Sequence, residues 1–67
     1  MFELRQGDTV LICHGKLKDH KVLALVDVSG NRASAIKRLT EAYIDTGYCP
    51  ARDAPEMAAE TVDGDLE

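Results

Sequence analysis

The sequence Lys21-Val-Leu-Ala-Leu-Val-Asp-Val28 decides the fold, because it is the clearest strand of the 67-residue chain. Successive side chains of a strand point to opposite sides of the sheet, so this stretch is apolar on both faces. One face carries Val22, Ala24, Val26 and Val28. The other carries Leu23 and Leu25. Such strands are typical of the centre of a sheet that a helix covers on one side, and the pattern leaves open which face is covered.

Two shorter strands are predicted before this stretch. Phe2 and Leu4 alternate with polar residues, and the segment Val10–Cys13 is apolar on both faces. Gln6–Asp8 indicates a turn between these two strands, and Gly15 marks the next break. Three consecutive strands joined by short turns predict an antiparallel meander.

A helix is predicted from about Arg32 to Thr46. Asn31 precedes it and suits the N-cap position, where its side chain accepts from free backbone amides. Gly47 suits the left-handed position after a helix, and Pro50 prevents continuation. The apolar stripe of this helix comprises Ala35, Ile36, Leu39, Ala42 and Tyr43. The predicted fold class is therefore α+β, a small three-stranded antiparallel sheet with one helix packed across it.

The end of the chain differs from the rest in charge. Residues 52–67 contain six acidic residues against Arg52 alone, which gives −5, whereas residues 1–51 carry +1. Large apolar residues are few in this segment, so burial cannot offset the entropy of ordering it. We expect a compact β-β-β-α domain over residues 1–51 and a disordered acidic tail over residues 52–67, with at most a fleeting turn at Pro55–Thr61. Deleting residues 53–67 should then leave the fold intact.

The sequence lacks the motifs of catalysis. Ser29 and Ser34 do not lie in a Gly-x-Ser-x-Gly context, and no glycine-rich phosphate loop is present. A domain of this length has little room for a deep pocket beside its own core. We therefore expect a protein that is not an enzyme and needs no cofactor.

Two cysteines and two histidines are the candidates for a metal site: Cys13, His14, His20 and Cys49. Structural zinc sites usually pair their ligands at short spacings such as Cys-x-x-Cys. Only Cys13 and His14 are close in sequence, and neighbours on a strand point to opposite faces. We expect no metal and two free thiols, because a disulfide between them would need an oxidising compartment.

The chain contains no apolar run of about 18 residues, the length that a membrane-spanning helix needs. Its start, from Met1 to Arg5, lacks the basic flank and the apolar stretch of a signal peptide. The sequence therefore predicts a cytoplasmic protein that does not enter membranes.

The segment Gln6–Ile12, followed by Gly15–Lys18 and Lys21–Leu23, is similar to the KOW motif of ribosomal proteins and transcription elongation factors. The resemblance implies a hairpin of an SH3-like β-barrel, in which the Gly-Lys loop contacts RNA or RNA polymerase. It covers about a quarter of the chain. The chain departs from the motif at Asp19 and His20, where a glycine is expected, and in the helix that follows.

These features predict binding rather than catalysis. A sheet that is apolar on both faces and has one helix leaves apolar surface exposed, which usually marks an interaction site. We expect a small non-enzymatic modulator or inhibitor that docks on a larger host protein or complex. By analogy, accessory proteins of phages and mobile elements act in this way on transcription or CRISPR machinery.

Two other interpretations stay open. The lysine-rich segment His14–Lys21 could neutralise phosphates, which would make the chain a nucleic-acid-binding module with a KOW-like hairpin. A homodimer, joined through the spare sheet face or an edge strand, is compatible with either function. The candidate partner-binding residues are Lys16, Lys18, Lys21, Leu23, Leu25, Arg32 and Arg38.

Overall fold

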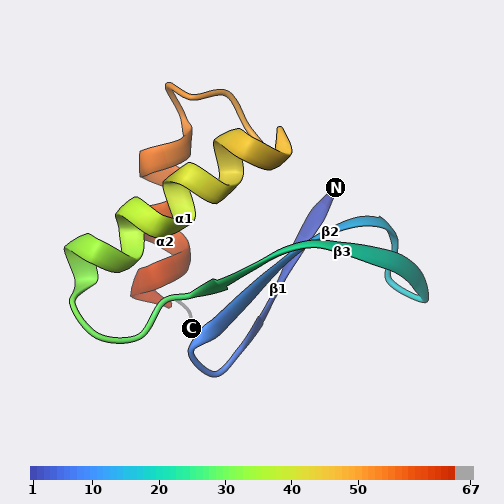
Figure 1. The fold of residues 1–67 in the computed structure, drawn as a ribbon, viewed down its shortest axis with the longest axis horizontal. Helices are drawn as coiled ribbons and strands as arrows, with labels where there is room; N and C mark the ends of the chain where they lie inside the picture. The colour runs from blue at the N-terminus through green and yellow to red at the C-terminus, as the bar shows by residue number, and fades with distance from the viewer. Residues whose placement is uncertain (65–67) are drawn as a thin grey trace.

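The computed structural model describes residues 1–64 and has the element order β-β-β-α-α (Figure 1). The elements are β1 (Phe2–Gln6), β2 (Thr9–Lys16), β3 (Asp19–Asp27), α1 (Arg32–Thr46) and α2 (Ala54–Asp63). The strands form one antiparallel sheet in the order β1-β2-β3. This confirms the predicted α+β class and the three-stranded meander. Both helices lie on the same side of the sheet, and the β2–β3 hairpin projects away from them (Figure 1).

Helix α1 begins and ends where the sequence predicts. The Asn31 side chain accepts a hydrogen bond from the Ser34 backbone amide at 3.2 Å, which satisfies one of the free donors of the first turn. Gly47 ends the helix in the left-handed conformation at φ 76°, and the Tyr48 amide donates back to the Tyr43 carbonyl at 2.9 Å. This C-cap satisfies carbonyls that the helix itself leaves unpaired.

The core lies between the sheet and the two helices. Val10 and Ile12 of β2 are fully buried there, and Val26 of β3 is nearly so. Leu39 and Tyr43, from the predicted stripe of α1, are fully buried against them. The structure thereby settles the question that the strand pattern left open, because the face with Val26 turns inward.

The predicted assignment of β3 residues to the two faces of the sheet is wrong at Val22, because β3 contains a bulge. Ile12 pairs with Ala24, but the next residue of β2, Cys13, pairs with Val22, so Leu23 is an extra residue in β3. A bulge of this kind resets the alternation of side chains beyond it. Val22 therefore lies on the opposite face from Ala24, although their spacing in the sequence predicts a shared face.

The prediction of a single helix followed by a disordered tail is wrong for Ala54–Asp63, which form a second helix, α2. Ala54–Asp63 form a regular helix that packs beside α1, and Ala54 and Ala58 are fully buried in the core. Pro55 lies in the first turn, where its missing amide costs nothing, and Glu56 favours the positive end of the helix dipole. The rest of the tail prediction, for residues 65–67, lies outside the described residues.

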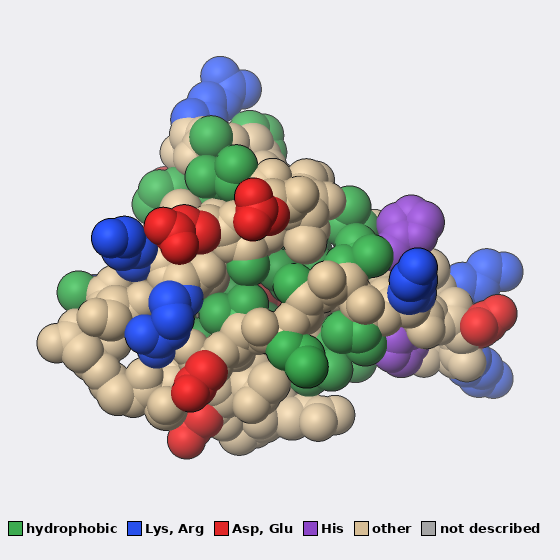
Figure 2. Space-filling view, viewed as in Figure 1, with side chains coloured by type: hydrophobic (Ala, Val, Ile, Leu, Met, Phe, Trp, Pro, Cys, Tyr) green, Lys and Arg blue, Asp and Glu red, His purple; other side chains and the backbone are tan. Residues whose placement is uncertain are grey.

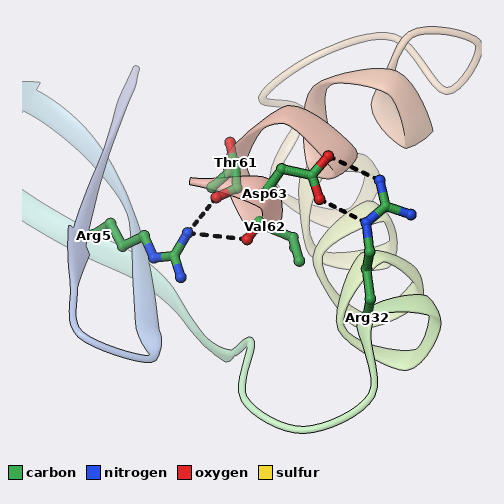
Figure 3. A network of polar contacts seen from close by, with 5 residues as sticks. All are labelled: Arg5, Arg32, Thr61, Val62 and Asp63. Carbon is green, nitrogen blue, oxygen red and sulfur yellow. Dashed lines mark hydrogen bonds and ion pairs between the residues drawn. The ribbon is translucent and has the colours of Figure 1, made fainter. Parts of the chain in front are cut away.

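Two charged residues of β1, Arg5 and Glu3, contact α2, and Figure 3 shows the contacts of Arg5. The Arg5 guanidinium donates to the Thr61 carbonyl at 2.5 Å and to the Val62 carbonyl at 3.3 Å, which caps the C-terminal end of α2. The Glu3 carboxylate accepts hydrogen bonds from the Thr61 hydroxyl at 2.8 Å and from the Tyr43 hydroxyl at 2.5 Å. Polar contacts to a distant strand thus add to the apolar contacts of α2, in which Ala54 and Ala58 are buried and Met57 and Val62 pack partly buried against the core.

Candidate binding surfaces

The side of the sheet that faces away from the helices is the open face. Strand pairing and pleating place alternate residues of each strand on this face. Its positions are Phe2, Leu4, Gln6, Thr9, Leu11, Cys13, His20, Val22, Leu25 and Asp27. The intervening residues of β1 point the other way, since Glu3 contacts α1 and Arg5 contacts α2.

Apolar side chains form two rows across the centre of the open face. The leucine row consists of Leu4, Leu11 and Leu25, which are paired across the three strands. The mixed row consists of Phe2, Cys13 and Val22, which are paired in the same way. Leu25 is 68% exposed and Val22 is 42% exposed. Phe2, Leu4 and Leu11 are half-buried and Cys13 is buried, so the most exposed part of the two rows lies on β3. A contiguous apolar cluster is more informative than single exposed apolar residues.

Charge is nearly excluded from the open face. Among the described residues, no lysine or arginine occupies one of its positions, and Asp27 at one end is the acidic residue. The Asp27 carboxylate accepts from the hydroxyl and the amide of Ser29 at 2.6 and 2.9 Å, which lowers the pKa of Asp27. Asp27 therefore stays ionised at neutral pH.

The opposite end of the sheet is basic. Lys16, Lys18 and Lys21 are all exposed on the β2–β3 hairpin, with Asp19 among them. Figure 2 shows these cations and the two histidines gathered at the projecting end of the molecule. Leu17, at the tip of the hairpin, is 70% exposed. This end of the molecule presents positive charge to any partner that approaches it.

His20 connects the basic hairpin to the open face. Its ring meets the ring of Phe2 edge-on, with the centroids 5.3 Å apart. Its Nδ1 atom lies 3.1 Å from the Leu17 carbonyl oxygen. These contacts place the imidazole at the border between the mixed row and the hairpin.

Arg32 and Arg38, two of the predicted partner-binding residues, lie with the helices rather than with the hairpin. Arg32 forms a two-pronged ion pair with Asp63, with N–O distances of 2.6 and 2.9 Å (Figure 3). This pairing lowers the pKa of Asp63 and raises that of Arg32. Arg38 donates to the carbonyls of Asp27 and Ser29. Both guanidinium groups thus join elements of the fold, whereas the three predicted lysines and Leu25 face solvent.

Sequence reasoning missed most of the open face. It selected Leu23 and Leu25, but Leu23 is the bulged residue and is 41% exposed. It did not select Phe2, Leu4 or Leu11, which share a face with Leu25. The available signal was the alternation in β1, where apolar residues at even positions are separated by charged residues.

The partly buried polar cluster of Glu3, Tyr43 and Thr61, between β1 and the helices, has a structural role. Burial raises the pKa of the Tyr43 phenol, and its hydrogen bond to the Glu3 carboxylate raises it further, although Thr61 opposes this. The phenol therefore remains protonated and serves as a donor. Burial also raises the pKa of the Cys49 thiol, with a further contribution from the nearby Asp53 carboxylate. A thiol of that kind is a poor nucleophile at neutral pH.

Within residues 1–64, no group of three or more histidine, cysteine or acidic side chains lies close enough to hold a metal ion. The two cysteines, Cys13 and Cys49, are free thiols. This part of the chain also contains no pocket and no helix long and apolar enough to cross a membrane. Comparison of the chain with family models, curated proteins and solved structures gives no match.

Proposed function

We propose that the protein is a non-enzymatic modulator or inhibitor that docks on a larger protein or complex through the open face of its sheet. The observation that carries this proposal is the content of that face, which is apolar at its centre and borders on a basic hairpin. Desolvation of contiguous apolar side chains is the main source of affinity in protein interfaces. By analogy with small accessory proteins of phages and mobile elements, the larger partner is sought in transcription or CRISPR machinery.

In this proposal the hairpin lysines contribute to the rate of association. Lys16, Lys18 and Lys21 are exposed and lie beyond the apolar centre of the face. Charges at the rim of an interface steer the encounter of two partners, whereas buried apolar contacts set the dissociation rate. The proposed partner therefore presents an apolar surface to the open face, and the lysines act on the rate at which the two proteins meet.

Nucleic-acid binding is the second candidate, supported by the same exposed lysines on a projecting hairpin. Three observations argue against nucleic-acid binding. Asp19 lies among the lysines and offsets part of their charge. Tyr43 is buried, so it offers no ring for base stacking. The formal net charge of the chain, −4, repels phosphates at long range.

The test is an affinity capture that compares two leucine variants. Leu25→Asp places a charge in the open face, and Leu17→Asp places the same charge at the hairpin tip, where the leucine is about equally exposed, 70% against 68%. We expect wild type and Leu17→Asp to retain a protein partner after nuclease treatment of the lysate and Leu25→Asp to lose it, because burying an unpaired carboxylate is strongly unfavourable. Retention of the partner by Leu25→Asp would contradict the proposal.

Nucleic-acid binding is measured separately with labelled duplex and single-stranded oligonucleotides. Phosphate contacts release counterions, so affinity would fall steeply between roughly 50 and 200 mM salt. The triple variant Lys16→Ala, Lys18→Ala and Lys21→Ala would then abolish binding and flatten the salt dependence. We expect no binding at micromolar concentration, and tight salt-sensitive binding by wild type would favour the second candidate.

A further inference from the structure

The ends of the open face differ in charge along the strand direction. At the hairpin end lie Lys16, Lys18 and Lys21, against Asp19. At the other end lie Asp27, on the open face itself, and Asp8 in the exposed β1–β2 turn. The apolar rows occupy the middle. A surface with opposite charges at its two ends and apolar residues between them is complementary to itself when one copy is reversed.

From this distribution we propose that a second copy of the chain covers the open face, as a face-to-face dimer with antiparallel alignment of the strands. The inference rests on the proposed function in one respect, namely that the open face binds protein. The two-fold axis lies in the interface and runs across the strands, between the leucine row and the mixed row. This operation places Asp27 of each copy over the Gly15–His20 pair of the partner's hairpin, with the exposed hairpin lysines at the edge of the contact, so that unlike charges come near one another at both ends.

The same operation pairs the rows in a way that suits their shapes. The leucine row of one copy packs on the mixed row of the other, so Leu25 meets the partner's Val22. Cys13 of the mixed row is fully buried within its own chain, so it takes no part in the contact. Packing large residues against small ones allows two layers to interdigitate, at the spacing of about 10 Å that stacked sheets adopt.

Alignment in the other direction, with the hairpins side by side, is disfavoured by charge. It would bring the six lysines of two hairpins together at one end and the two Asp27 carboxylates together at the other. Like charges brought together at an interface repel, and the repulsion selects against that arrangement. The charge distribution therefore points to one of the two symmetric alignments.

The size of the face predicts a weak dimer. Three strands at about 4.8 Å spacing and about eight residues at 3.3 Å per residue give a flat area of roughly 400 Å², against about 800 Å² per partner in a standard interface. We therefore expect a dissociation constant in the micromolar range or weaker. A larger protein that binds the same face more tightly would displace the second copy, so self-association and docking compete.

The first experiment is sedimentation equilibrium of the full chain from about 10 µM to 1 mM at roughly 150 mM salt. We expect the apparent mass to rise from the monomer value of 7.3 kDa toward twice that value. Leu25→Asp should remain monomeric, whereas the matched variant Leu17→Asp should still associate, weakened no more than a few-fold because its carboxylate lies at the exposed hairpin tip. Amide spectra that overlay on the wild-type spectrum outside the substituted strand confirm that each variant is folded.

A second variant tests the alignment without altering the apolar rows. Lys18→Glu reverses a charge at the exposed hairpin tip, so in the antiparallel dimer it meets the partner's Asp27 and should weaken association a few-fold. Stronger association of Lys18→Glu would overturn the antiparallel arrangement. In mixtures of labelled and unlabelled chains, methyl contacts between copies should join Leu25 to Val22, whereas the alignment with the hairpins side by side would join Leu25 to Leu4.

The outcomes separate this inference from the proposed function. A wild-type chain that stays at the monomer mass up to about 1 mM overturns the dimer, because the weakest specific interfaces saturate near that concentration. The proposed function then stands if Leu25→Asp still loses its larger partner. If Leu25→Asp retains both the larger partner and self-association, the open face is not a protein-binding surface and both proposals are wrong.

Discussion

The two faces of the sheet are made by the same three strands, yet they differ in the charged side chains that they carry. The covered face packs Val10 and Ile12 against the helices and also carries half-buried Glu3 and exposed Arg5, whose charged groups bind the helices directly. The open face keeps its central positions apolar, with Leu25 68% exposed. In β1, the charged residues Glu3 and Arg5 therefore lie on the covered face, and the apolar residues lie on the open face.

The difference shows that hydrophobicity alone does not choose which face of a small sheet is covered. A charged group can lie half-buried on the covered side if it is hydrogen-bonded there, and Glu3 receives hydroxyl donors from both helices. An apolar group remains outside if the fold has no element left to cover it. The open face thus reflects a shortage of covering structure rather than a lack of apolar residues.

The strongest test of the covered face is removal of α2. Deleting residues 53–67 removes the buried Ala54 and Ala58 and leaves the Glu3 and Arg5 side chains without their partners in this helix. A chain of this size has roughly 3–10 kcal/mol of total stability, so we expect the deletion to remove most of it. Amide spectra should lose their native dispersion, contrary to the prediction from sequence. Spectra that overlay on those of the full chain would show that α2 is dispensable.

A pair of neighbouring alanines provides the control for that deletion. Ala58→Asp puts a carboxylate into the core, whereas Ala59→Asp puts the same group on a half-buried position of the same helix. Chemical denaturation should show a much larger loss of unfolding free energy for the first variant. Equal losses would mean that the helix is not docked through Ala58.

The second test compares one leucine from each face. Leu39→Ala leaves a cavity in the core, because Leu39 is fully buried, and should lower the unfolding free energy by about 2–4 kcal/mol. Leu25→Ala on the open face should change it by no more than about 0.5 kcal/mol in the monomer. Urea denaturation at low protein concentration measures both. A large loss for Leu25→Ala would show that the open face is covered in the monomer.

The third and smallest expected effect concerns the polar cluster of the covered face. Tyr43→Phe removes a hydroxyl that donates to Glu3 and should cost about 1–2 kcal/mol of unfolding free energy. Because the fold raises the pKa of Tyr43, the stabilisation is complete below the unfolded pKa near 10 and is lost as pH rises through the folded value.

The difference in stability between wild type and Tyr43→Phe should therefore shrink on alkaline titration above about pH 10. Tyr48→Phe is the control, since Tyr48 stacks on Tyr43 with ring centroids 4.9 Å apart but is only half-buried. A constant difference between wild type and Tyr43→Phe across that range would show that the phenol is not the group that titrates.

Much of the fold could be predicted because its signals are local. Helix α1 is specified by Asn31 and Gly47 at its ends and by a stripe centred on Leu39, all within one short segment. The turns between strands are specified by glycines that adopt positive φ, such as Gly7 at 60° and Gly15 at 119°. At Gly15 a Cβ atom would come within 2.8 Å of the Asp19 carbonyl oxygen, so glycine is required for the close hairpin.

The candidate binding surfaces were predicted less completely. The exposed hairpin lysines follow from the turn at Gly15, because residues around a hairpin tip have few neighbours to cover them. The open face did not follow, because the bulge at Leu23 moves Val22 to the side of Leu25. A bulge depends on how two strands fit together, and no residue in β3 predicts where it occurs.

The sequence by itself determined the three strands, their turns and the first helix, since each depends on interactions between residues close in the chain. Only the tertiary structure decided the rest. Helix α2 is stable where Arg5 and Glu3 reach its last turn from the other end of the chain, 56 and 58 residues away. The covered face was likewise decided by tertiary packing, because Val10, Ile12 and Val26 meet the helices there and Glu3 accepts hydrogen bonds from both of them.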